Sequence, residues 1–185
     1  CVQFSLCAGM ELDEEAFSAL KAAVAKEVAR ERAVRILTAS AVSERELEKR
    51  LVQKGVLPSD AGDAVAWLKE HRFLDDAATA AQLVDSAVRK GYGRARVKNI
   101  LYEKGIPKDL WEEALARIPA MDDAIDRFLA AKLRGRTADE KTIKKTIDAL
   151  LRRGFSYGEI RDALRRYEAD LEDLELEETM TEELE

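Results

Sequence analysis

The chain has 185 residues, of which 46% are hydrophobic, 37% charged and 6% aromatic, and its net charge is −6. This composition is typical of a helical protein with much exposed surface, and the length is enough to bury a core in one domain or several small ones. Its apolar runs all fall short of the roughly 18 residues that cross a bilayer, so we expect no membrane partner.

Charge is unevenly distributed along the chain. Residues 168–185 hold ten acidic residues and no basic one, so residues 1–167 carry 31 basic and 27 acidic side chains, a net charge of +4. A mildly basic body joined to an acidic tail indicates either a solvated end or an interaction tail, one that competes for the basic surface or itself binds a partner.

The chain begins with CVQFSLC, whose alternation of apolar and polar residues favours a short strand. Because Cys1 and Cys7 are the two cysteines, we expect ordinary reduced thiols in a cytoplasmic protein. A long helix is predicted to start near Asp13, since no Gly or Pro interrupts residues 13–54. Its apolar stripe comprises Phe17, Leu20, Val24, Val28, Ala33, Ile36 and Leu37.

One pattern then occurs three times: LVQKGVLPSDAGDAV, LYEKGIPKDLWEEAL and LLRRGFSYGEIRDAL. Its glycines, Gly55, Gly105 and Gly154, lie 50 and 49 residues apart. A cation precedes each glycine and an apolar residue follows it, which predicts a helix that ends in a left-handed glycine. Periods of this length are typical of stacked helical modules.

Capping signals mark where the helices begin. Ser43 with Glu46, Thr137 with Glu140 and Ser156 with Glu159 form predicted capping boxes, and Asp75 with Asp76 is predicted to cap the helix that follows. That helix carries the apolar stripe Ala77, Ala80, Ala81, Val84 and Val88.

The predicted fold is all-α, with three tandem three-helix repeats that stack into an elongated, curved molecule, and with the short N-terminal strand as a further element. We assign residues 1–28 to an N-terminal segment and leading helix, and residues 168–185 to the acidic C-terminal tail. The repeats occupy residues 29–74, 75–118 and 119–167. We expect the molecule to be a monomer.

The sequence offers no constellation of catalytic residues. It has no phosphate loop, nucleotide fingerprint or zinc-protease motif, and its one histidine, His71, stands at a predicted helix end. We therefore expect a protein that is not an enzyme, with no cofactor and no metal site. Trp67 and Trp111, at equivalent places in two repeats, are interpreted as packing residues.

Basic residues are the stronger signal. Between Arg89 and Lys108 there are seven cations and one acid, Glu103, and repeat three has a similar cluster. We interpret the cations as either a solvated face or a surface for phosphates or an acidic protein partner, and the free N–H groups of a helix N-terminus would add to such a surface. The candidate contact residues are Arg89, Lys90, Tyr92, Arg94, Arg96, Lys98, Lys144, Arg152 and Arg153.

The run SERELEKRLVQKG, followed by LKEHRFLDDAATAAQLVDSAVRKGYGRARVKNILYEKGI, resembles the RecX family of bacterial recombinase regulators. The resemblance covers roughly residues 29–167. Thr79 departs from it, because relatives usually place an aromatic residue there, and repeat three is more diverged.

The resemblance implies three tandem three-helix units and a protein that binds the RecA–DNA filament. It is expected to lodge in the groove of the filament and to restrain ATP hydrolysis, strand exchange and co-protease activity in DNA repair. Two alternatives remain. One is a helix-turn-helix-like module that binds DNA, including single-stranded DNA, directly. The other is an interaction scaffold that binds through its acidic tail.

Overall fold

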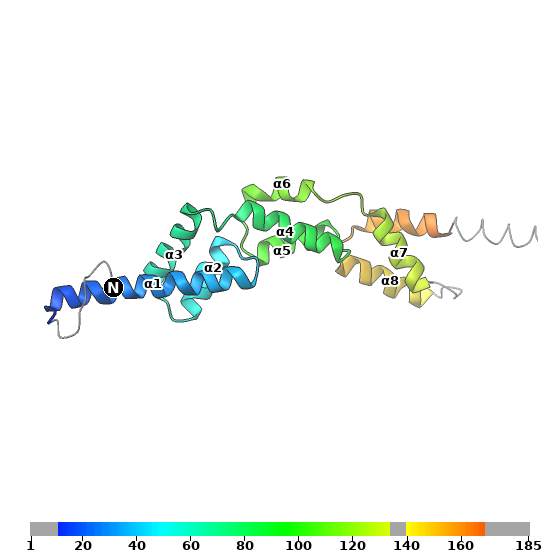
Figure 1. Cartoon of the computed structure of the whole chain (residues 1–185). Helices are drawn as coiled ribbons and strands as arrows, with labels where there is room; N and C mark the ends of the chain where they lie inside the picture. Colours follow the sequence, from blue (N-terminus) through cyan, green and yellow to red (C-terminus); the bar gives the residue numbers. More distant parts are fainter. Residues whose placement is uncertain (1–10, 134–139, 169–185) are drawn as a thin grey trace, which may run out of the picture. The chain divides into compact units, whose positions relative to one another are not determined.

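The computed structural model describes residues 11–133 and 140–168, and all regular secondary structure within them is helical. The all-α prediction is therefore confirmed for this part of the chain. The predicted N-terminal strand, Thr137 and the acidic tail beyond Glu168 lie outside the described residues. In chain order the elements are α1 (Glu14–Ala39), α2 (Glu44–Gln53), α3 (Pro58–Glu70), α4 (Asp76–Arg89), α5 (Arg94–Glu103), the 3-10 helix η2 (Lys108–Leu110), α6 (Trp111–Ala116), α7 (Asp122–Leu133), α8 (Glu140–Arg152) and a helical stretch at 157–168 (Figure 1).

The chain divides into two compact units. The first comprises Cys1–Thr79 with Lys104–Pro107, and the second comprises Ala80–Glu103 with Lys108–Glu185. The turn that ends α5 thus belongs to the first unit, although its sequence lies in the second predicted repeat. The elongated shape and the residue boundaries of the repeats stay predictions.

Left-handed glycines end the second helix of each repeat, as predicted. Gly55, Gly105 and Gly154 have φ angles of 83°, 70° and 89°. The N–H of Val56 donates to the carbonyl of Leu51 at 3.1 Å, which closes the helix in the manner of a Schellman motif. Such positive φ angles favour glycine, because a Cβ atom would crowd the backbone there.

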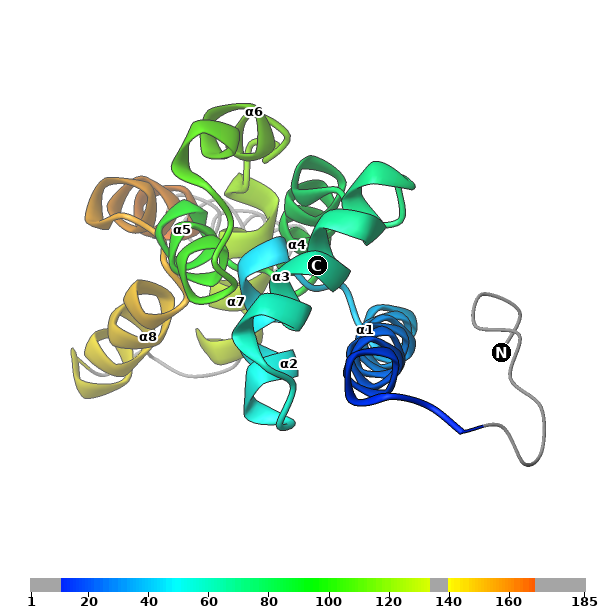
Figure 2. The same cartoon turned by 90° about the vertical axis from the view of Figure 1, so that its left-hand side faces the viewer.

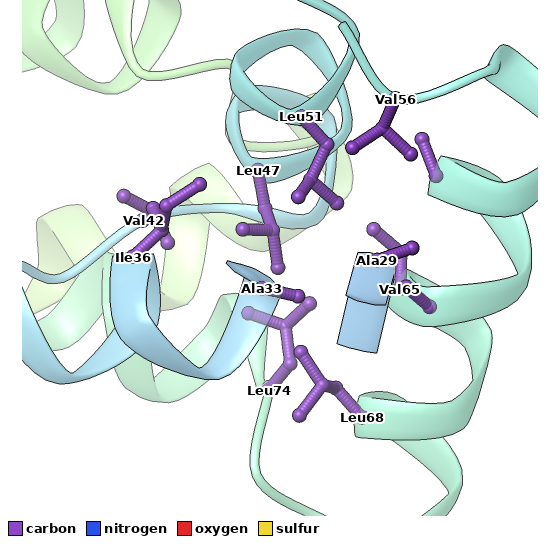
Figure 3. Packing of buried hydrophobic residues seen from close by; sticks show 12 residues of the cluster. Ala29, Ala33, Ile36, Val42, Leu47, Leu51, Val56, Val65, Leu68 and Leu74 are labelled. Carbon is purple, nitrogen blue, oxygen red and sulfur yellow. The ribbon is translucent and has the colours of Figure 1, made fainter. Parts of the chain in front are cut away.

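In the first unit, α1 packs on α3 and α2, and α2 packs on α3. Figure 2 shows α1 nearly end-on beside the other two helices. Buried side chains from all three meet in one cluster (Figure 3). The members are Ala29, Ala33, Ile36, Val42, Leu47, Leu51, Val56, Ala61, Ala64, Val65, Leu68 and Leu74.

The stripe predicted for α1 is only partly buried. Asp13 caps the helix by accepting the N–H of Ala16 at 2.7 Å, as the predicted start requires. The buried face begins at Ala29, however, and Phe17 and Val24 are more than half exposed. The reason is that α2 and α3 cover only the C-terminal part of α1.

The start of α2 is capped by two acceptors from different parts of the chain. Ser43 Oγ accepts the N–H of Glu46 at 3.1 Å, and Asp76 Oδ1 accepts the N–H of Glu44 at 2.9 Å. The predicted box of Ser43 and Glu46 is thus half formed, because the Glu46 carboxylate pairs with Arg50 and Lys104 instead.

The prediction that Asp75 and Asp76 both cap α4 was half wrong. Asp75 Oδ1 caps α4, because it accepts the N–H groups of Ala77 and Ala78 at 2.8 and 3.1 Å. The carboxylate of Asp76 instead caps α2. Burial raises the pKa of Asp76, since desolvation outweighs the stabilising N–H of Glu44. Thr79 is buried, with its hydroxyl 3.5 Å from the carbonyl of Val42.

In the second unit, α5 packs on α6 and α7 packs on α8. The buried face of α4 is formed by Ala80, Val84 and Ala87, whereas Ala77 of the predicted stripe is exposed. The third repeat has its own cluster of buried residues, which comprises Ile125, Leu129, Leu133, Leu150, Phe155, Ile160 and Ala163. The capping box of Ser156 and Glu159 is fully formed, with both reciprocal hydrogen bonds present.

A substitution at Asp76 tests its role as a buried cap. Because the folded-state pKa is raised, the contribution of Asp76 to stability is greatest below its unfolded pKa of 3.8 and is lost as the pH rises through the folded-state value. Asp76→Asn keeps an oxygen acceptor without the charge, so we expect it to be at least as stable as the wild type at neutral pH. Urea unfolding near pH 4 should show that any advantage disappears.

Asp76→Ala is the matched control. It removes the acceptor and should cost about 1 kcal/mol near pH 4, and less at neutral pH, where the charged carboxylate contributes less to stability. A large loss for Asp76→Asn at neutral pH that shrinks in acid would contradict a raised pKa.

Candidate protein and nucleic-acid interface

The candidate cations lie around the turn that joins α4 to α5. Helix α4 ends at Arg89, Gly91 takes a φ of 68°, and α5 begins at Arg94. The first turn of α5 contains no acidic residue. Cations near a helix N-terminus oppose the helix dipole, so this arrangement leaves the start of α5 strongly electropositive.

The turn after α8 seats directly on the start of α5. The N–H of Gly93 donates to the carbonyl of Arg153 at 2.8 Å, and the N–H of Ala95 donates to the carbonyl of Gly154 at 3.1 Å. We name this contact, residues 90–96 with 153–155, the Gly93–Gly154 junction. It corrects the expectation of free N–H groups at this helix start for one of them, because the Ala95 N–H is occupied from within the chain.

Only glycine fits at the centre of the junction. A Cβ atom on Gly93 would lie 2.4 Å from the carbonyl oxygen of Gly154, and one on Gly154 would lie 2.2 Å from the backbone nitrogen of Arg96. The two backbones are therefore in direct contact. The glycine of the third repeat serves both to end α8 and to permit this approach.

An equivalent contact occurs in the first unit. There the turn at Lys104 and Gly105 seats on the start of α2, where Ser43 Oγ donates to the carbonyl of Lys104. Ser43 lies 50 residues before Gly93, and Lys104 lies 49 residues before Arg153, so the two contacts occupy the same repeat positions. The glycine turn of one repeat thus packs on the second helix of the preceding repeat.

Three of the candidate cations are engaged within the second unit. Arg153 donates to the carbonyl of Lys90 at 3.3 Å, and its guanidinium lies 4.7 Å from the ring centroid of Phe128. Arg94 donates to the carbonyl of Leu115 at 3.2 Å. Arg96 pairs with Glu103 at 3.3 Å. These side chains hold the junction and the end of α6, and each retains further donors.

The other candidate cations are exposed, and their side chains have no hydrogen bond or ion pair within residues 11–133 and 140–168; they are Arg89, Lys90, Lys98, Lys144 and Arg152. The junction brings Lys90 close to Arg153. Lys144 is separate, because eight residues place it about 12 Å along α8 from Arg152. Tyr92 is half-buried.

Three carboxylates of the second unit pair with arginines that are not among the candidate cations. Asp85 binds Arg117 through both carboxylate oxygens, and this hydrogen bonding raises the pKa of Arg117. Asp122 and Asp126 both pair with Arg166, at 3.2 and 3.0 Å.

Sequence reasoning missed Tyr102, which is 71% exposed on α5 and lies one turn after Lys98. Val52 and Leu151 occupy the same position, three residues before their glycines, and are also exposed. The sequence signal that could have identified this position is a hydrophobic or aromatic residue that directly follows the buried leucine of each repeat. An exposed aromatic beside a cation suits protein contacts and base stacking alike.

The one histidine lies in a structural environment. His71 follows α3, its Nδ1 is 2.8 Å from the carbonyl of Trp67, and the two rings lie 4.6 Å apart. Trp67 also packs on the core of the first unit, as predicted. Within the described ranges, no group of three or more acidic, His or Cys side chains is placed to hold a metal. No helix of the described part is both long enough and apolar enough to span a membrane.

Two glycine substitutions separate backbone strain from the junction contact. Gly55 and Gly154 have similar φ angles, but a Cβ on Gly55 would meet nothing within 4 Å. We expect Gly55→Ala to cost about 1 kcal/mol from strain alone. Gly154→Ala adds a collision with Arg96 and should cost about 2 kcal/mol more.

Chemical denaturation followed by circular dichroism measures both variants. Equal losses for the two alanine variants would show that the junction contributes nothing to stability.

Comparison with known proteins places the chain in a family. Models of the first, second and third three-helix domains of RecX match residues 29–68, 75–115 and 122–164. The regulatory protein RecX of Cronobacter sakazakii is 33% identical over 153 residues, which cover 75% of this chain and 91% of that protein. The corresponding protein of Escherichia coli O1:K1 is 32% identical over 151 residues, which cover 74% of this chain and 90% of that protein.

Solved structures agree on the fold. A crystal structure of a regulatory protein RecX has a TM-score of 0.70 and 22% identity, with 87% of this chain and 83% of that chain covered. The structure of RecX from Lactobacillus salivarius also has a TM-score of 0.70, at 18% identity, with 80% of this chain and 99% of that chain covered. The three matching domains and the curated relatives show that the chain belongs to the RecX family of regulatory proteins.

Proposed function

We propose that the protein binds the RecA–DNA filament and inhibits the ATPase, recombinase and co-protease activities of RecA. The observation that carries the proposal is the cationic surface around the Gly93–Gly154 junction, on a chain of RecX three-helix domains. RecA as the partner comes from the family resemblance. We also propose that the protein acts in the cytoplasm, as a monomer and without enzymatic activity.

The proposed mechanism is restraint of the filament by many modest contacts. Exposed side chains such as Lys90, Lys98 and Arg152 would each meet a phosphate or a carboxylate. Tethered contacts add up, because the first one raises the effective concentration of the next. A protein held in this way across neighbouring RecA subunits would hinder the changes in the filament that accompany ATP hydrolysis.

The alternative is direct DNA binding, and the exposed pair of Lys98 and Tyr102 favours it. A helix-turn-helix reader places the N-terminal residues of its recognition helix against base edges. The start of α5 is instead covered by the turn after α8, at Gly93 and Ala95. This geometry argues against major-groove reading by α5 and favours contacts from its exposed face.

Charge reversal at two unpaired lysines tests the proposed surface. Lys90 and Lys98 are exposed, and neither side chain has a partner among the residues that the structure describes. In a RecA ATPase assay on single-stranded DNA, substoichiometric wild-type protein should inhibit hydrolysis. Lys90→Glu with Lys98→Glu should raise the concentration for half-inhibition by about tenfold or more, because like charges would then face the partner.

The matched control is Lys21→Glu with Lys49→Glu, which changes the net charge equally at exposed sites of α1 and α2. It should inhibit within about twofold of the wild type, since loss of non-contacting charges acts only through screened long-range attraction. If wild-type protein leaves ATP hydrolysis unchanged, the filament proposal fails. Equal affinity for bare and RecA-coated DNA would favour the direct DNA-binding alternative.

Removal of the acidic tail distinguishes between the two roles considered for it. If the tail competes for the basic surface, removal of residues 168–185 should tighten binding at low salt. If the tail is itself the binding element, the truncated protein should lose inhibition.

A further inference from the structure

The first unit contains a cationic cavity that is not part of the surface described above. Its volume is about 520 Å³. It lies between the C-terminal part of α1 and the end of α2, and its lining residues are Arg32, Arg35, Ile36, Ala39, Arg50 and Lys54. Four of these six residues are cations.

Intramolecular bonds hold two of the guanidinium groups in place. Arg32 Nη1 donates to the carbonyl of Lys54 at 3.0 Å. Arg50 donates to Ser40 Oγ at 3.1 Å and also binds the carboxylate of Glu46. A cation that is already positioned loses less conformational entropy when a ligand arrives.

Most of the donors of these groups remain available. A guanidinium has five N–H donors, and an ammonium has three. The bonds within the described residues use one nitrogen of Arg32, one of Arg35 and two of Arg50, and they leave the side chain of Lys54 unpaired. The cavity therefore presents several charge-assisted donors to a ligand.

The charge balance of the cavity is positive. Glu31 pairs with Arg35 at 2.6 Å, and Glu46 is shared between Arg50 and Lys104. Two carboxylates thus oppose four lining cations, which leaves an excess of two positive charges even before Lys104 is counted. A single carboxylate ligand would neutralise half of this excess, whereas a phosphate monoester carries about −1.5 to −2 at neutral pH.

The volume and the lining of the cavity suit a ligand larger than an inorganic ion. Ligand sites for small molecules usually measure about 300–1,000 Å³, and this cavity falls within that range. Ile36 and Ala39 add an apolar wall against which a sugar or base could pack. We infer that the cavity between α1 and α2 binds a phosphate group carried by a nucleotide or by a nucleic-acid strand.

The inference does not depend on the filament proposal, because the ligand is measured on the full chain in the absence of RecA. The test is calorimetric titration at low salt with inorganic phosphate, ADP and a short oligothymidylate. The test variant is Arg35→Gln with Lys54→Gln. Arg35 forms only an exposed ion pair and Lys54 forms none within the described chain, so both changes should leave the fold intact.

We expect the wild type to bind ADP or the oligonucleotide, and we expect the test variant, which loses two cations, to bind it at least about tenfold more weakly. If the source is a strand, the logarithmic salt dependence of binding should also fall by about 1.4, or about 0.7 for each lost phosphate contact. If the source is a free nucleotide, ADP should bind and the oligonucleotide should not displace it. Either result supports a phosphate site.

The matched control is Lys21→Gln with Lys49→Gln, which removes the same charge from α1 and α2 at positions outside the cavity. It should bind as the wild type does. The inference is overturned if both double variants weaken binding equally, if no phosphate ligand binds the wild type, or if polyglutamate binds the cavity as tightly as ADP. The last outcome would assign the cavity to an acidic peptide.

Discussion

The glycine turn that ends the second helix of a repeat is the contact on which the rest of this structure depends. It closes that helix through a left-handed residue, and it also packs on the start of the second helix of the preceding repeat. At Gly154 the approach is so close that a Cβ atom would lie 2.2 Å from Arg96 N. At Gly105 the equivalent contact is made through Ser43 and Lys104. Glycine thus satisfies two requirements at this turn: it can adopt the positive φ angle, and its lack of a Cβ atom lets the second backbone approach closely.

This contact also organises the charges. Carbonyl groups of Arg153 and Gly154 satisfy N–H groups at the start of α5, where cations oppose the helix dipole. The carbonyls supply the negative partner that an acidic cap would otherwise provide. The side chains of Lys90 and Lys98 are exposed and have no partner among the described residues, and the proposed interface rests on them. In the separate cavity of the first unit, the cations come together because the C-terminal parts of α1 and α2 lie side by side.

Local patterns in the sequence predicted much of this fold. The spacing of Gly55, Gly105 and Gly154 identified the helix ends, and the box of Ser156 and Glu159 identified a helix start. Contacts between residues far apart in the chain could not be predicted in this way. Asp76 caps a helix that begins 32 residues earlier, and Arg153 reaches Lys90 across 63 residues. Periodicity shows which face of a helix is buried, but not which distant backbone group will need an acceptor.

The central claim is that the turn after α8 and the start of α5 form one cooperative contact, and amide hydrogen exchange of the full chain tests it most directly. The N–H groups of Gly93 and Ala95 donate across this contact, so they can exchange only when it opens. The account predicts that both amides are protected to about the same free energy as the amides in the last turns of α8. Exchange of Gly93 and Ala95 at the rate of unprotected amides, while α8 stays protected, would contradict it.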